Sequence, residues 1–251
     1  MISSVELRHW SKVFDATDEQ IRRDHLISHV LSHLAHIEEP GLVFYGGTAL
    51  ARTHLDTFRL SEDVDLLARP RNRWNQVIET RLLRALRREF GTVTWTVSPC
   101  EAKEPAAALL HTEGALQLKI QVAELDYDRG LWPTEKRSIL MRYKDLSPIS
   151  MTVPTATAFA AMKMSAYLNR FAPRDLADLA ELANRGMIDA EAIALARRVI
   201  GWAPSPRMFS SVPSGTTNSW EVDLAHQLAA LPDPDDCLRR VRTALTEALR
   251  G

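Results

Sequence analysis

Apolar residues recur at helical spacing in the first part of the chain and predict a long helix over residues 17–38. Thr17, with Gln20 three positions later, fits a capping box for its first turn. Four histidine side chains share one flank of this helix, within an arc of about 80°. The four residues are His25, His29, His33 and His36. Such a stripe can ligate a metal ion, but a flank of partly buried or solvent-facing imidazoles is the commoner outcome, and we favour it.

The next stretch alternates short apolar runs with a glycine pair. The run over 42–45 predicts a buried strand that ends in a tight turn at Gly46 and Gly47, and a helix is expected over 48–54. After a polar loop, a second strand is predicted over 64–67. This order of strand, glycine turn, helix and strand indicates a domain of mixed α and β structure.

Three further patterns follow. Residues 69–88 combine many arginines with regularly spaced apolar residues, which predicts a basic amphipathic helix. Residues 92–97 and 115–123 alternate with a period of two, as strands with one wet side do. The polar face of the second strand carries Gln117, Lys119 and Gln121.

Beyond Pro154 the pattern is helical throughout. Three helices that begin with a good cap or a proline are predicted over 156–170, 173–186 and 189–202. Two more helices are expected around a loop over 203–218 that is rich in Pro, Ser and Gly. The expected fold is therefore α+β, with a domain over residues 1–150 that includes the N-terminal helix and an all-helical domain over 151–251.

Composition and charge restrict the possible partners. The chain has 251 residues, 25% charged and 45% hydrophobic, which excludes disordered and collagen-like proteins. Its formal net charge is −1, so a nucleic acid must be bound by a local basic patch. The outer face of the arginine-rich helix is a candidate RNA-binding patch, although a solvated helix face explains it equally well. Its arginines include Arg81, Arg84 and Arg88.

Cysteine spacing and hydropathy exclude other classes. Cys100 and Cys237 are far apart and form no CxxC or Cys/His motif, which argues against a structural zinc site and against a disulfide scaffold. No apolar stretch of about 18 residues occurs, and no apolar run precedes Arg8 and Trp10. We expect a cytoplasmic protein without a membrane segment.

Candidate chemistry is concentrated around the second predicted strand. Asp63 and Asp65 alternate within it, so both carboxylates point the same way and can share one Mg²⁺ or Mn²⁺ ion, whose remaining ligands come from the phosphates of an NTP. Other residues can hold those phosphates through the backbone of the glycine turn or through hydroxyl groups. They are Gly46, Gly47, Thr48 and Ser61.

A glycine pair followed about fifteen residues later by SxDxD resembles the active site of polymerase-β-type nucleotidyltransferases. More narrowly, GGTAL with RLSEDVDL resembles the first motif of the AbiEii/AbiGii family of nucleotidyltransferase toxins, which includes the mycobacterial MenT toxins. The later segment KMSAYLNRFAPRDLADLAEL resembles a second motif of that family, and the resemblance covers roughly residues 17–185. It implies functional positions at Lys163, Arg170, Arg174, Asp175 and Asp178.

The residues of the second motif admit two interpretations. Lys163 and Arg170 lie on one side of a predicted helix, where both can reach a triphosphate. Asp175 and Asp178 lie at a helix start, and they either pair with nearby cations or take part in catalysis. Polymerase-β-type enzymes usually bring a third carboxylate from a later strand, and the polar face of 115–123 offers none. Either Asp175 or Asp178 supplies that charge, or the enzyme works with fewer metal ligands and relies on Lys163. The first option fits the family pattern better.

These features favour an NTP-dependent nucleotidyltransferase that moves a nucleoside monophosphate to an acceptor hydroxyl and releases pyrophosphate. The resemblance implies that the acceptor is the 3′ end of tRNA, that the transfer is toxic, and that a cognate antitoxin exists. Two alternatives stay open. One is a nucleotidyltransferase that modifies a protein or a small molecule, and the other is a non-catalytic nucleotide- or RNA-binding module.

Overall fold

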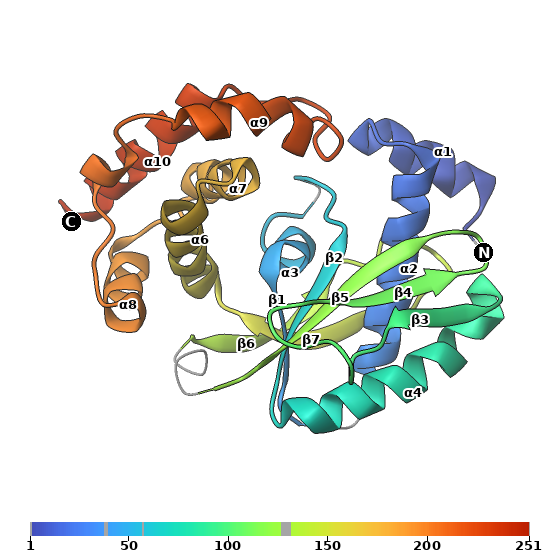
Figure 1. Ribbon diagram of the computed structural model, residues 1–251. Helices are drawn as coiled ribbons and strands as arrows, with labels where there is room; N and C mark the ends of the chain where they lie inside the picture. The colour runs from blue at the N-terminus through green and yellow to red at the C-terminus, as the bar shows by residue number, and fades with distance from the viewer. Residues whose placement is uncertain (1, 38–39, 57, 127–131, 251) are drawn as a thin grey trace. The chain divides into compact units, whose positions relative to one another are not determined.

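The computed structural model describes residues 2–37, 40–56, 58–126 and 132–250. The chain folds as two compact units. Unit 1 comprises Met1–Gly130 with Glu135–Val153, and unit 2 comprises Leu131–Thr134 with Pro154–Gly251. Figure 1 shows that strands are gathered in the first unit and that the second is built from helices.

Unit 1 is organised around a five-stranded sheet in the order β1-β2-β5-β4-β3. β2 and β5 pair in parallel, and the other neighbouring pairs are antiparallel, so the sheet is mixed. β6 and β7 form a separate two-stranded sheet. The strands are β1 (Leu42–Tyr45), β2 (Asp63–Ala68), β3 (Val93–Val97), β4 (Ala108–Thr112), β5 (Gln117–Glu124), β6 (Thr134–Ile139) and β7 (Ile149–Pro154). The α+β class with a mixed sheet is confirmed, whereas the sequence patterns do not predict β4, β6 and β7.

The helices of unit 1 begin at well-formed N-termini. The capping box predicted at Thr17 is present, because its side chain accepts from the backbone N–H of Gln20 and the Gln20 side chain accepts from the N–H of Thr17. An unpredicted helix precedes it, with a second capping box at Ser3. The helices are α1 (Ser4–Phe14), α2 (Asp18–Ala35), α3 (Gly46–Thr53) and α4 (Arg71–Phe90).

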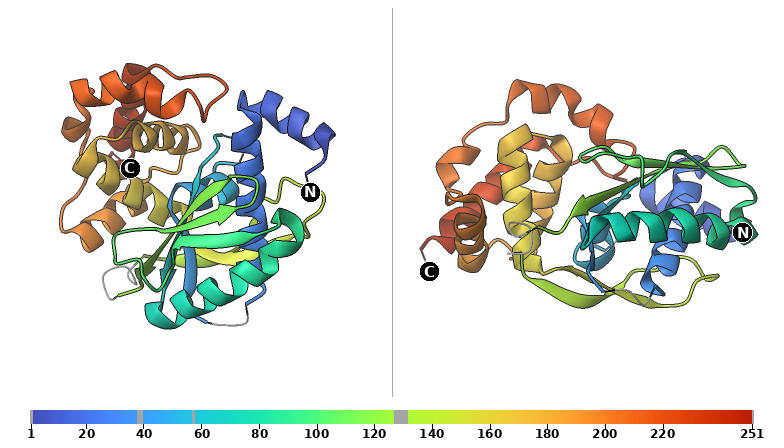
Figure 2. Two further views of the ribbon diagram at one scale, coloured as in Figure 1. Left: turned by 45° about the vertical axis from the view of Figure 1, so that its right-hand side comes forward. Right: turned by 60° about the horizontal axis from the view of Figure 1, so that its bottom comes forward.

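The five-stranded sheet has one apolar and one polar face. Helices α2 and α4 contact β5, and Figures 1 and 2 show both helices along the sheet. The β-strand side chains Val64, Leu118 and Ile120 are fully buried on the covered face. Because successive side chains point to opposite faces, Asp63 and Asp65 lie on the other face, as the sequence predicts.

A buried ionic network connects α2 with α3 and with the segment that follows β6. The Asp24 carboxylate accepts from Arg52 at 2.8 Å, from Arg142 at 3.1 Å and from the Tyr143 hydroxyl at 2.9 Å. All four residues are at most 7% exposed. Burial by itself raises the pKa of Asp24, but Arg142 and Arg52 lower this pKa below its usual value. The network therefore holds a charged carboxylate inside unit 1.

Unit 2 is helical. Its helices are α6 (Ala156–Arg170), α7 (Pro173–Asn184), α8 (Ala190–Ile200), the 3₁₀ turn η1 (Pro206–Phe209), α9 (Ser214–Leu224) and α10 (Pro234–Ala248). Thr155 and Asp189 cap α6 and α8 as expected, by accepting from the N–H groups of Ala158 and Ala192. The loop expected over 203–218 is wrong, because it contains η1 and the start of α9. No helix in the described part of the chain has the length and hydropathy needed to cross a bilayer.

Candidate active site

The two carboxylates of the SxDxD motif lie in β2, with both residues partly exposed. The parallel register with β5 sets Lys119 beside Asp63 and Gln121 beside Asp65, so all four residues share the open face of the sheet. The ammonium group of Lys119 and the amide of Gln121 thus lie on the strand next to the two carboxylates. The described residues on this face offer two carboxylates from β2 and none from β5.

Gly46 lies directly against Asp65. Its φ is +78°, which residues with a Cβ rarely adopt, and a Cβ at this position would be only 2.1 Å from Asp65 Oδ2. The glycine pair forms the first turn of α3, so the expectation that the helix starts at Thr48 is wrong. Tyr45 occupies the cap position but makes no side-chain cap hydrogen bond. The first N–H groups of α3 therefore lie next to Asp65 without a side-chain cap.

Arg59 is a site neighbour that the sequence pattern did not reveal. Its Nη2 lies 2.8 Å from where a Cβ at Gly47 would be, and Ser61 Oγ lies 3.4 Å from that point. Arg59 is 2% exposed, and its Nη1 donates to the Leu60 carbonyl. A buried guanidinium thus lies against the glycine pair and near Ser61. An arginine two residues before the SxDxD motif was the available signal.

Thr48 joins the glycine turn to the carboxylate strand. It is 2% exposed, its hydroxyl donates to the backbone carbonyl of Asp63, and its Oγ1 lies 2.8 Å from Ser61 Oγ. A hydroxyl has one proton and a carbonyl can only accept, so Ser61 is the donor in the contact between the two hydroxyls. The buried Thr48 therefore holds the backbone of Asp63 and the side chain of Ser61 in place through these two hydrogen bonds.

The second motif forms one ion-paired group inside unit 2. Lys163 Nζ lies 2.9 Å from Asp175 Oδ1 and 2.7 Å from Asp178 Oδ2, and Arg170 Nε donates to Asp175 at 2.6 Å. Asp175 is 0% exposed and Asp178 is 1% exposed. Burial raises the pKa of Asp175, but Lys163 and Arg170 lower it below its usual value. The Arg170 side chain is 59% exposed, so one cation of the group faces solvent.

The arginines predicted to bind RNA lie on the outside of α4. Arg81, Arg84 and Arg88 are exposed, whereas Trp74, Ile78 and Leu82 of the same helix are at most 1% exposed. Since α4 covers the apolar face of the sheet, these arginines are on the side opposite to the carboxylates of β2. Binding to these arginines alone therefore does not bring a ligand next to Asp63.

Comparison with known proteins identifies the family. Residues 29–247 match the family model described as the nucleotidyl transferase AbiEii toxin of type IV toxin–antitoxin systems. The chain belongs to the AbiEii family. AbiEii membership makes it a nucleotidyltransferase, the toxin of a type IV toxin–antitoxin system, with an antitoxin as partner. The sequence-based interpretation of the fold and the enzyme class is confirmed.

Solved structures give the same fold for this AbiEii protein. The nucleotidyltransferase toxin MenT4 of Mycobacterium tuberculosis is 19% identical, with a TM-score of 0.67 over 92% of this chain and 84% of that chain. JHP933 of Helicobacter pylori is 14% identical, with a TM-score of 0.60 over 94% of each chain. The comparison with curated proteins gives no match.

Proposed function

We propose that this AbiEii toxin transfers a nucleoside monophosphate from an NTP to a hydroxyl at the 3′ end of an RNA, with tRNA as the preferred class, and that it does so in the cytoplasm. The observation that carries the proposal is the close packing of Gly46 against Asp65, which sets the N-terminus of α3 beside the carboxylates. An anion-binding backbone next to paired acids suits a nucleotide triphosphate with its counter-ion.

The donor atoms on the open face fit a hard divalent cation. Asp63 and Asp65 offer carboxylate oxygens from one strand, and no imidazole or thiol is in register with them on β5. Mg²⁺ or Mn²⁺ bound there would neutralise phosphate charge and polarise the phosphorus that is attacked.

The chain's own residues would position the phosphates. The first N–H groups of α3 offer donors to phosphate oxygens, and Thr48 and Arg59 pack around the glycine turn that carries them. Ser61 donates its hydroxyl proton to Thr48, and this proton would have to turn to a phosphate oxygen when the nucleotide binds. Unit 2, taken by itself, carries the exposed guanidinium of Arg170, which is suited to bind a phosphate, and Asp175 fixes its direction. Lys163, and with it Asp178, completes that group.

RNA is favoured as acceptor by the exposed arginines of α4. Because Arg81, Arg84 and Arg88 lie on the opposite side of the sheet from Asp63, they would bind phosphates of the RNA body and not the reacting end. An acceptor as large as tRNA can make both contacts, whereas a small molecule cannot.

A transfer assay with matched variants tests the proposal. Purified protein is incubated with Mg²⁺, total RNA and each α-³²P-labelled NTP in turn, and the RNA and protein fractions are separated. We expect labelled tRNA with the wild type, and a loss of at least 10²-fold with Asp63→Asn or Asp65→Asn. Glu62→Gln is the control, because Glu62 lies between Ser61 and Asp63 but pairs with Arg23 at 3.1 Å.

The other outcomes are equally informative. If the label is found in the protein fraction or in a small molecule, the acceptor is that protein or small molecule and not RNA. Undiminished transfer by Asp63→Asn and Asp65→Asn, with folding confirmed by circular dichroism, would remove the carboxylates from the mechanism.

A further inference from the structure

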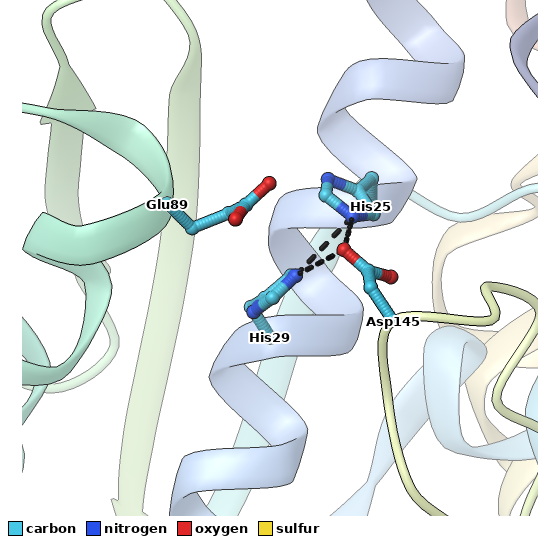
Figure 3. A group of neighbouring side chains, drawn as sticks. All are labelled: His25, His29, Glu89 and Asp145. Carbon is cyan, nitrogen blue, oxygen red and sulfur yellow. Dashed lines mark hydrogen bonds and ion pairs between the residues drawn. The ribbon is translucent and has the colours of Figure 1, made fainter. Parts of the chain in front are cut away.

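A group of histidines and carboxylates lies apart from the β2 carboxylates. It contains His25 and His29 from α2, Glu89 from α4 and Asp145 from the segment between β6 and β7 (Figure 3). One ligand atom from each side chain lies within 4.8 Å of all the others. Only half of the predicted imidazole stripe takes part: His33 is partly buried, and His36 is exposed with Nδ1 2.6 Å from the Ser32 carbonyl.

Three of these ligand atoms converge closely. Asp145 Oδ2 lies 2.9 Å from His25 Nε2 and 3.3 Å from His29 Nε2, and the two imidazole nitrogens are 3.2 Å apart. If both nitrogens carry protons and donate to Asp145, the remaining contact brings two donors together. A central cation would replace all three contacts by ligand bonds. Two ligand atoms on a tetrahedral zinc ion are about 3.3 Å apart, given bond lengths of about 2.0–2.1 Å.

We propose that His25, His29, Glu89 and Asp145 bind one Zn²⁺ ion in a structural site. Two imidazoles with two carboxylates suit Zn²⁺, whereas Mg²⁺ prefers an all-oxygen set. Four protein ligands close a tetrahedral shell, which is typical of structural and not catalytic zinc.

The surroundings agree with this assignment. Burial lowers the pKa of His25, and burial together with the neighbouring His25 lowers the pKa of His29 to about 4. His25 is packed between the rings of Phe90 and Tyr143, with centroids 5.6 Å and 4.8 Å away, which fixes its orientation. A cavity of about 630 Å³ is lined by His25 and Glu89 and provides access for the ion.

Zinc at this position would tie together distant parts of unit 1. His25 and Asp145 are 120 residues apart in sequence, and Glu89 lies near the end of a third element, α4. A ligand that binds only the folded protein stabilises it by mass action. A hundredfold excess of free Zn²⁺ over the dissociation constant should therefore raise Tm by roughly 5–10 °C.

The test uses a background in which the β2 carboxylates cannot bind zinc. The full chain carrying Asp63→Asn and Asp65→Asn is stripped with a chelator and titrated with ZnCl₂, and with CoCl₂ as a spectroscopic probe. We expect one Zn²⁺ per chain by elemental analysis, the intense visible absorption of tetrahedral Co²⁺, and the rise in Tm. His29→Gln and Asp145→Asn, each added to this background, should lose all three signals.

His33→Gln is the matched control, since it removes an imidazole from the same helix outside the group and should leave zinc binding unchanged. Circular dichroism of each metal-free protein checks that it is folded. His29 is 9% exposed and Asp145 lies at the surface side of the group, so these two variants are better tolerated than a change at His25. No zinc binding by the background protein, or equal binding by His29→Gln and Asp145→Asn, would overturn the proposal.

Discussion

Gly46→Ala is expected to inactivate transfer through a single methyl group. The Ala Cβ would lie 2.1 Å from Asp65 Oδ2 and 2.8 Å from its Cγ, whereas an ordinary contact is 3.4 Å or more. The Asp65 carboxylate therefore has to move by more than 1 Å. The Asp65 Cβ also lies 2.9 Å from the added methyl group, so rotation of the side chain is not enough and the backbone of α3 or β2 has to shift as well.

The magnitude follows from two separate effects. A displacement of about 1 Å in a positioned catalytic group costs on the order of 10²-fold in rate, so kcat/KM should fall about a hundredfold. The positive φ of Gly46 adds backbone strain of about 1–2 kcal/mol once a Cβ is present, and this lowers the free energy of unfolding without touching the reaction.

Gly201→Ala separates these effects. Gly201 has a φ of +82°, close to that of Gly46, but a Cβ there meets nothing within 4 Å. It should show the same strain in a denaturant melt and keep wild-type kcat/KM in the labelled-NTP assay. Near wild-type transfer by Gly46→Ala, or an equal loss in Gly201→Ala, would refute the argument that displacement of Asp65 is the cause.

Three other changes test the remaining groups. Asp24→Asn leaves buried guanidinium groups without a counter-charge and should lower the free energy of unfolding by about 3–5 kcal/mol in a urea melt. The pKa of Asp24 is lowered in the folded protein, so wild-type stability should fall as the pH drops below about 4, and the variant should not show this loss. Lys163→Met removes the ammonium group that Asp175 and Asp178 share, although Asp175 keeps Arg170, and it should cost about 3–5 kcal/mol; an unchanged melt would contradict a structural role for Lys163. Replacing three exposed arginines of α4 by glutamine should raise KM for RNA more than it lowers kcat, and reduce the salt slope of binding by roughly 0.7–0.9 for each RNA phosphate that the variant no longer binds; an unaltered slope would mean that RNA docks elsewhere. The three are Arg81, Arg84 and Arg88.

Local signals in the sequence predict the elements that depend on local physics. The capping box at Thr17 marks the start of α2, and the period-two alternation of 115–123 marks β5. Strand β6 carries no such signal, because its sequence, TEKRSI, is polar except at its end and shows no hydrophobic alternation. Glycine disfavours helix, so the sequence predicts a turn at Gly46, yet the role of this residue is to leave room for Asp65.

The β2 carboxylates are predictable for the same reason, since two acids separated by one residue in a strand must share a face whatever the rest of the chain does. Arg59 is not predictable in this way, because a charged side chain becomes buried only through contacts made by other segments.

The histidine group shows where sequence reasoning reaches its limit. The spacing of His25 and His29 is local and correctly puts both imidazoles on one face of α2, but spacing alone also fits His33 and His36, which stay outside the group. His25 and His29 differ from the other two histidines because Asp145 and Glu89 lie close to them in the fold. Asp145 is 120 residues from His25 in sequence, and Glu89 belongs to α4. Pairing over such distances is set by how α2 and α4 pack on the sheet. A histidine stripe in a sequence therefore predicts a face, and the fold decides which of its members meet carboxylates.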